Sequence, residues 1–174
     1  MALPSTDLVL DEVRRRLDFQ FELSDSHDFK ASIVLGTSGI VIAMLLTALP
    51  LAQAQLDSLL KVVEYKTAVL AAIGISLLVL FVSIILSITV LWIRNYNRPP
   101  RLERLRNYYI AEPKEETQLQ LIDIFIPAID NNEKILKRQT YLIRAATVLL
   151  SIGLLIFISL LSWFIMIFFK AIAV

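Results

Sequence analysis

The sequence predicts an all-α integral membrane protein with three transmembrane helices, an amphipathic N-terminal helix and a cytoplasmic helical extension of the third span. The first observation is composition: 57% of the residues are hydrophobic and 19% are charged, against about 25% charged in soluble domains. The second is the clustering of the charges, which leaves residues 31–56, 67–93 and 145–169 without any. Each window exceeds the roughly 20 apolar residues that cross a bilayer core of about 30 Å.

Residues 1–30 are predicted to form a cytoplasmic amphipathic arm. A helix is expected over residues 6–23, with Ser5 or Thr6 placed to cap its start. Its apolar residues recur at helical spacing: Leu8, Val9, Val13, Leu17 and Phe21. Because neither proline nor glycine occurs between Pro4 and Gly36, this helix either runs straight into the first span or bends near residues 25–28.

The first span is predicted at residues 31–51, where Pro50 either ends the helix or kinks its last turn. Residues 52–66 form a short external connection with one apolar face. A cleaved signal peptide is an alternative reading, since Ala52-Gln53-Ala54 resembles a cleavage site. It is disfavoured because the apolar run is longer than the usual 7–15 residues and the region before it is long and acidic.

The second span is predicted at residues 67–93 and the cytoplasmic basic linker and helices at residues 94–144. Pro99-Pro100 break the helix that leaves the second span. Helical periodicity returns from residue 115, is interrupted at Pro127, and then continues without a breaker into the third span at residues 145–169. Residues 170–174 form an external tail. The arm is expected to pack with residues 115–126 and 130–144 in a small cytoplasmic bundle.

The lysines and arginines predict the orientation. Of the 17 in the chain, 14 lie in the arm and in residues 94–144, and 3 lie in the connection and the tail. Loops rich in these residues stay in the cytoplasm. The sequence therefore predicts a multi-pass protein of the plasma (inner) membrane, with its N-terminus cytoplasmic and its C-terminus external.

Small and weakly polar residues recur on one face of each predicted span. They are Ser32, Gly36, Gly39 and Ala43 in the first, Ala72, Ser76, Ser83 and Ser87 in the second, and Thr147, Ser151 and Ser162 in the third. In lipid, small residues let helix backbones approach closely. Two interpretations of these stripes stay open. They pack helices within one subunit, or they form a surface that lines a pore or faces another subunit.

The predicted inner membrane boundary carries charged anchors. Lys30 can lay its stem along lipid while its ammonium group stays among the headgroups, and Asp28 is expected to pair with a cation or to cap a helix. A gating or partner-binding role is the alternative for this pair. A basic cluster follows the second span and is predicted to contact anionic lipids: Arg94, Arg98, Arg101, Arg104 and Arg106.

Several function classes are disfavoured by residues that the sequence lacks. None of the three windows contains the charged residue that a proton relay, an ion-coupled carrier or an intramembrane catalyst normally needs. There are no cysteines, which excludes disulfides and thiolate chemistry. The lone His27 has no second histidine at a metal-binding spacing and is expected at the surface. We therefore expect no enzymatic activity, no cofactor, no metal and, at a net charge of +1, no nucleic-acid partner.

Two stretches carry a resemblance to known membrane proteins of bacteria and archaea. The stretch "SDSHDFKASIVLGTSGI" is similar to the entrance to the first span of the Pycsar-effector membrane domain, where a D-x-K-A-S-like element precedes an apolar stretch with a small-residue pair. It matches at Asp28, Lys30, Ala31 and Ser32. The stretch "IDNNEKILKRQTYLIRAATVLLSIGLL" resembles the helix-into-span layout of SLATT-type proteins.

The resemblance implies a membrane effector of nucleotide-signalled defence that oligomerises and impairs the membrane. The chain departs from those families because it shows no fused cyclic-nucleotide-binding or enzymatic domain, so a signal is expected through a separate protein or the cytoplasmic helices. The leading hypothesis is a non-enzymatic, homo-oligomeric effector or channel-like protein. The alternative is a structural or scaffolding subunit that binds another membrane or signalling protein and forms no pore.

Overall fold

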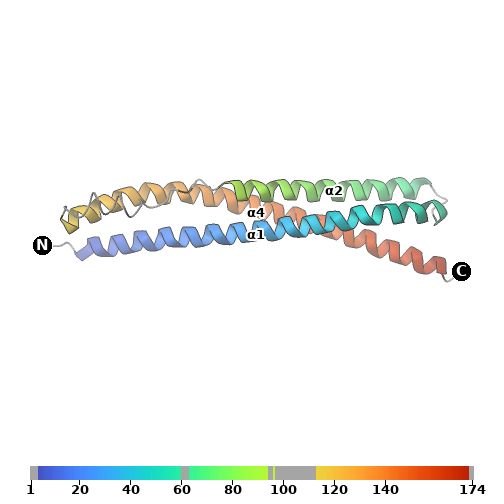
Figure 1. The fold of residues 1–174 in the computed structure, drawn as a ribbon, viewed down its shortest axis with the longest axis horizontal. Helices are drawn as coiled ribbons and strands as arrows, with labels where there is room; N and C mark the ends of the chain where they lie inside the picture. The colour runs from blue at the N-terminus through green and yellow to red at the C-terminus, as the bar shows by residue number, and fades with distance from the viewer. Residues whose placement is uncertain (1–3, 60–62, 94–95, 97–112, 173–174) are drawn as a thin grey trace. The chain divides into compact units, whose positions relative to one another are not determined.

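The computed structural model describes residues 4–59, 63–93, 96 and 113–172, and these residues are helical throughout apart from positions 93, 96 and 113. The helices are α1 (Pro4–Leu59), α2 (Val63–Trp92) and α4 (Lys114–Ile172) (Figure 1). Three stretches are long and apolar enough to cross a membrane: Thr6–Thr47, Thr67–Trp92 and Lys114–Met166. The all-α class and the count of three candidate spans are therefore confirmed for the described residues.

Helix α1 joins the predicted arm and the first predicted span in one helix that has no break at residues 25–28. It also passes Pro50 and ends at Leu59, so the prediction that Pro50 ends the helix was wrong. The flanking stretch is rich in Leu, Ala and Gln, which favour helix and offset the loss of one hydrogen bond at the proline. Most of the predicted connection at residues 52–66 therefore belongs to α1 or α2.

Helix α4 contains Pro127 in its interior, which corrects the predicted interruption at that residue. A proline inside a helix removes the hydrogen bond to the carbonyl four residues earlier, here that of Asp123. Both Pro127 and Asp123 are exposed, so this carbonyl lies on the outer side of the helix, where water can bond it. The prediction of one long helix that continues into the third span is correct for α4.

The chain divides into two compact units. Unit 1 comprises Met1–Asp28 and Ile93–Tyr141, and unit 2 comprises Phe29–Trp92 and Leu142–Val174. Helices α1 and α4 each contribute one part to each unit. The divisions fall within a few residues of the inner ends that the sequence predicts for the three spans.

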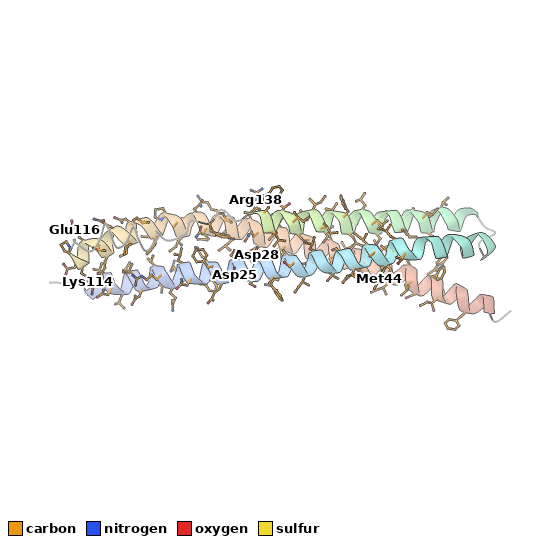
Figure 2. The ribbon with its side chains drawn as sticks, viewed as in Figure 1. Asp25, Asp28, Met44, Lys114, Glu116 and Arg138 are labelled. Carbon is orange, nitrogen blue, oxygen red and sulfur yellow. The ribbon has the colours of Figure 1, made fainter. Side chains whose placement is uncertain are left out.

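Unit 1 is built on α1 and α4, which run side by side in the same direction (Figure 1). Asp7 near the start of α1 pairs with Lys114 at 3.3 Å, and Lys114, at the start of α4, is labelled in Figure 2. Further along, Gln20 Nε2 donates a hydrogen bond to the carbonyl oxygen of Ile129, at 3.0 Å. The apolar core lies between these points and contains Leu10, Val13, Leu17, Leu121, Ile122 and Phe125.

The register of α1 in unit 1 differs in part from the predicted one. Val13 and Leu17 are buried as expected. Leu8 is 73% exposed, and the buried leucine at this end of α1 is Leu10 instead. The buried positions alternate by four and three residues, which is the spacing of a coiled-coil seam: Thr6, Leu10, Val13, Leu17, Gln20, Ser24 and His27.

Unit 2 packs α1, α2 and α4 around an apolar core. The core residues are Val34, Val41, Leu45, Leu80, Ala146 and Leu150, with Ala31, Val90 and Ile143 in a second cluster. Helix α2 runs opposite to α4, since Ser83 bonds to residue 146 and Ser76 bonds to residue 153. Large apolar side chains also cover the outside, among them Ile40, Phe81 and Leu155, which in water would be an unusually apolar surface.

Candidate functional site

A seam of buried serines joins α2 to α4 in unit 2. Ser83 Oγ donates to the carbonyl oxygen of Ala146 at 2.8 Å, and Ser76 Oγ donates to that of Gly153 at 3.3 Å. Ser87 Oγ bonds within α2, to the carbonyl oxygen of Ser83 at 2.9 Å. All three serines are fully buried. The predicted serine stripe of α2 therefore packs inside one subunit, where carbonyl acceptors satisfy hydroxyls that burial would otherwise penalise.

Gly153 lets α2 and α4 approach closely, and the sequence analysis did not single it out. A Cβ atom added at Gly153 would lie 2.7 Å from Leu80 Cδ2 and 2.8 Å from Leu80 Cγ. Leu80 is fully buried, so its side chain has little room to move. The signal was present in the sequence, because Gly153 lies seven residues after Ala146 and so falls on the same helix face.

Ser38 is the buried serine of α1 in unit 2. It lies on the seam that contains Val34 and Val41, and its Oγ has no hydrogen-bond partner among the described residues. A buried hydroxyl without a partner destabilises a fold by about 1–3 kcal/mol. Ser38 and Ser83 are therefore equally buried, but Ser83 Oγ has a hydrogen-bond partner and Ser38 Oγ has none among the described residues.

The predicted stripe of α1 lies on a different face from this seam. Ser32, Gly36, Gly39 and Ala43 are all exposed, and a Cβ atom added at Gly36 or Gly39 would meet nothing within 4 Å. Packing of α1 in its own subunit therefore does not use this stripe. The interpretation of this stripe as packing within one subunit is therefore not supported by the described residues, and a surface that faces a pore or another subunit stays a prediction.

The predicted stripe of α4 is also exposed. Thr147 donates to the carbonyl oxygen of Ile143 at 2.9 Å, and Ser151 donates to that of Thr147 at 3.0 Å. Hydroxyls in helices commonly bond to their own backbone in this way. Ser162 is exposed as well, and Ala72 is half-buried. Ala72 lines a groove of about 350 Å³ between α2 and α4, beside Leu155, Ile156, Ser159, Leu160 and Trp163.

Unit 1 contains a buried polar cluster centred on Gln139, which is fully buried. Gln139 Nε2 donates to the carbonyl oxygen of Ile93 at 2.9 Å, and Gln139 Oε1 accepts from the hydroxyl of Tyr96 at 2.5 Å. The amide thereby holds the chain just after α2 against α4. The ring of Tyr96 also meets that of Phe21 edge-on, at 6.4 Å between centroids.

His27 belongs to the same region and is buried, with 5% of its surface exposed, so the prediction of a surface histidine was wrong. Its Nε2 lies 3.3 Å from Thr140 Oγ1. Thr140 gives its one hydroxyl proton to the carbonyl oxygen of Leu136 at 2.8 Å. A hydroxyl has a single donor, so Thr140 Oγ1 is the acceptor in its contact with His27 when its proton bonds the Leu136 carbonyl. The spacing from Ser24 and Gln20 would have placed His27 on the seam.

Burial raises the pKa of the Tyr96 phenol above its ordinary value of 10.0, since the charged form is disfavoured away from water. The negative charge of Asp28 acts in the same direction, while hydrogen bonds with Ser24 and Gln139 oppose it. At the other end of unit 1, hydrogen bonding by Gln118, then Lys114, lowers the pKa of Asp7.

The residues predicted at the membrane boundary are only partly described. Lys30 is exposed and Asp28 is half-buried, whereas Asp25, labelled beside it in Figure 2, is exposed. The basic cluster predicted to contact anionic lipids lies outside the described residues. Within the described ranges, no three His, Asp or Glu side chains gather as metal ligands would.

No protein family, curated protein or solved structure shows a significant match to this chain.

Proposed function

We propose that this chain is a non-enzymatic, three-pass integral membrane protein that self-associates through α1 and acts as an effector or channel-like protein that impairs the membrane. The observation that carries the proposal is the exposed small-residue face of α1, where the space over Gly36 and Gly39 is open. This face lies in a span whose contacts with its own subunit use other residues.

Two exposed glycines inside an apolar helix need a physical reason. Glycine in a helix interior is less stable than alanine by about 0.5–1 kcal/mol, and no contact within the described residues requires its small size at Gly36 or Gly39. In lipid, association of helices depends on close packing and not on expulsion of water. A second helix that approaches at Gly36 and Gly39 supplies the reason.

The two units suggest which part lies in the bilayer. The outside of unit 2 is apolar, as a lipid-facing surface is, and the three helical directions in unit 2 alternate as three consecutive passes require. The outside of unit 1 carries ion pairs that favour water, such as Glu133 with Lys137 at 2.6 Å. With the lysine and arginine distribution, this supports a plasma (inner) membrane protein with unit 1 and the N-terminus in the cytoplasm and the C-terminus outside.

The same topology gives the boundary residues their roles. Lys30 anchors the start of the first span in the headgroups, with Asp28 on the cytoplasmic side. The arginines at positions 94, 98, 101, 104 and 106 attract anionic lipids, at about 1 kcal/mol for each charge near the surface.

A scaffolding subunit without a pore is the second candidate. The observation that favours it is the hydrogen bonding of Ser76 and Ser83 to α4, because these hydroxyls are occupied and do not line a water-filled path within one subunit. In a channel-like oligomer, the polar lining would have to come from the exposed faces of α1 and α4.

Purified full-length protein in mild detergent tests self-association by light scattering. We expect an oligomer for the wild type and a shift toward monomer for Gly36→Leu and Gly39→Leu. Gly74 on α2 is the control, because it is exposed with nothing within 4 Å of an added Cβ atom but has no second glycine near it, unlike the pair Gly36 and Gly39 on α1. Gly74→Leu should leave the oligomer intact.

A monomeric wild type, or equal behaviour of Gly36→Leu and Gly74→Leu, would overturn the proposal. Ion leakage from liposomes then separates the two candidate functions. An oligomer that makes liposomes leak is channel-like, and the leak should be lost in Gly36→Leu. An oligomer that leaves liposomes tight is a scaffold.

A further inference from the structure

The groove between α2 and α4, which we call the α2–α4 groove, lies where the buried core of unit 2 ends. Among the residues whose burial is described, Ser76 is the first buried residue of α2 and Gly153 is the last of α4. Ala72 lies four residues before Ser76 and so on the same face of α2, yet it is only half-buried. The two helices therefore leave apolar space open beyond the contact between Ser76 and Gly153.

The side chains along the α2–α4 groove offer an occupant little to bond with. None of its described lining residues is charged, and Ser159 Oγ already donates to the carbonyl oxygen of Leu155 at 2.8 Å. A polar occupant would give up its hydrogen bonds elsewhere without gaining new ones here. Trp163 differs, because its indole N–H is a donor and tryptophan favours the headgroup level of a membrane. The groove therefore suits a hydrocarbon chain that has a polar group at the Trp163 end.

The size of the α2–α4 groove also favours a hydrocarbon chain over a helix. Leu155 and Trp163 are eight residues apart, which is about 12 Å along α4. Over this length the volume of about 350 Å³ gives a mean cross-section of about 30 Å², whereas a helix about 10 Å across fills roughly 80 Å². Close packing of a further helix also depends on small residues, and Leu155, Leu160 and Trp163 are large.

We propose that the α2–α4 groove holds one acyl chain of a phospholipid of the external leaflet. The acyl chain runs along α4 from Trp163 toward Leu155, with the ester group of the lipid beside the indole N–H. This inference goes beyond the proposed function and rests on its topology, because unit 2 must lie in the bilayer with the C-terminus outside. Ala72 is the residue that leaves room for the acyl chain.

Lipid retention by the purified full-length protein tests the proposal. Ala72→Leu fills the groove with a side chain, whereas Ala71→Leu makes the same change at the preceding residue, which is exposed and does not line the groove. Each protein is purified in mild detergent with added phosphatidylcholine, and native mass spectrometry counts the lipids that stay bound. We expect one retained phospholipid per chain for the wild type and Ala71→Leu, and several-fold lower occupancy for Ala72→Leu. Melting of the purified variants verifies that both fold.

Tryptophan fluorescence shows whether lipid or protein fills the groove. The chain has two tryptophans, so Trp92→Phe leaves Trp163 alone. In phosphatidylcholine vesicles with brominated acyl chains, we expect strong quenching of Trp163, because bromine quenches an indole that the acyl chain touches. The reference is Phe81→Trp at an exposed position of α2, in a chain that also carries Trp92→Phe and Trp163→Phe.

Equal lipid retention by Ala72→Leu and Ala71→Leu, or no retained lipid on the wild type, would overturn the inference. An unquenched Trp163 beside a quenched Phe81→Trp would mean that a protein segment fills the groove, so that only the groove inference fails. If neither tryptophan is quenched, lipid does not surround unit 2, and the proposed function fails as well.

Discussion

The buried residues of α1 have the same spacing in the two units, but the outer surfaces of the two units differ in polarity. In each unit the buried positions of α1 alternate by three and four residues, as a coiled-coil seam does. Unit 1 buries Gln20, Ser24 and His27 and carries charges outside, whereas unit 2 buries Val34, Val41 and Leu45 around Ser38 and is apolar outside. The difference teaches that one helical geometry is kept while the buried residues and the polarity of the outer surface change.

In unit 1 the apolar cluster gains from removal of each side chain from water, about 1.5–3 kcal/mol for a fully buried Leu, Val or Phe. In unit 2, if lipid surrounds it, that gain is absent between helices, and close contact with hydrogen bonding takes its place. Gly153, Ser76 and Ser83 supply this contact at the α2–α4 interface. Substitutions that act on packing should therefore matter most in unit 2, and those that act on buried polar groups should matter in unit 1.

The largest effect is expected at Gly153. Gly153→Leu forces side-chain atoms into the space of Leu80, and overpacking of this kind destabilises a fold by about 1–3 kcal/mol or more. We expect a lower SDS fraction at the unfolding midpoint, followed by the fluorescence of Trp92 and Trp163. Gly74→Leu is the control and should unfold like the wild type. Equal midpoints for the two variants would contradict the close approach at Gly153.

The next effect is expected at Gln139 in unit 1. Gln139→Leu keeps a similar volume but removes the donor to the Ile93 carbonyl, at about 1–3 kcal/mol for a buried group left without a partner. It also removes one of the two hydrogen-bond partners of the Tyr96 hydroxyl, which keeps its bond with Ser24. Faster amide hydrogen exchange across residues 114–141 should report the loss. Lys137→Ala removes only an exposed ion pair with Glu133, and such pairs contribute little because water screens them. It is the control and should leave exchange nearly unchanged.

Most of the fold was predictable from the sequence, because the length of a charge-free stretch and the helical period are properties of local stretches of the chain. Charge-free length predicted the three candidate spans. Helical period predicted a helix over residues 6–23, which is the first part of α1, and the continuation of α4. The helix end expected at Pro50 and the interruption expected at Pro127 do not occur, because both helices continue despite the hydrogen bond that each proline removes. Long-range partners could not be predicted. The seam spacing places His27 on the buried face of α1, but no local pattern identifies Thr140, more than a hundred residues later, as the residue beside it.

For the candidate site too, the sequence predicted local patterns but not the contacts between helices. Period alone identified a serine stripe on α2 and a glycine stripe on α1. Helical period does not show that Ser83 bonds to the carbonyl oxygen of Ala146, or that the space over Gly36 is open. Both outcomes depend on which faces of the three helices meet. The seven-residue spacing from Ala146 places Gly153 on the same face of α4, but this spacing does not identify Leu80 as the side chain that lies against it.

A smaller effect should separate two buried serines of unit 2. Ser83→Ala removes a hydrogen bond to α4, and such bonds between membrane helices average about 0.6 kcal/mol. Ser38→Ala removes a hydroxyl without a partner among the described residues and should be neutral or stabilising. The same SDS titration compares them. The assignment of these hydroxyls would be contradicted if Ser38→Ala were the more damaging substitution.

The smallest effect concerns pH and Tyr96. Because the pKa of Tyr96 is raised in the folded protein, the folded state holds its proton more tightly than the unfolded state. The stabilisation is complete below the ordinary pKa of 10.0 and is lost as pH rises above it. Thermal melts of the wild type should shift downward above that pH. Tyr96→Phe should show a weaker downward shift, and an equal shift in both proteins would exclude Tyr96 as its source.

Thiol accessibility in sealed membrane vesicles tests the central claim that lipid surrounds unit 2 and cytoplasmic water surrounds unit 1. Single cysteines at Ile40 in unit 2 and at Lys134 in unit 1 both replace exposed residues. We predict that a water-soluble maleimide labels Lys134→Cys only from the cytoplasmic side and leaves Ile40→Cys unlabelled from either side until detergent is added. Rapid labelling of Ile40→Cys in intact vesicles, or labelling of Lys134→Cys from outside, would contradict the account.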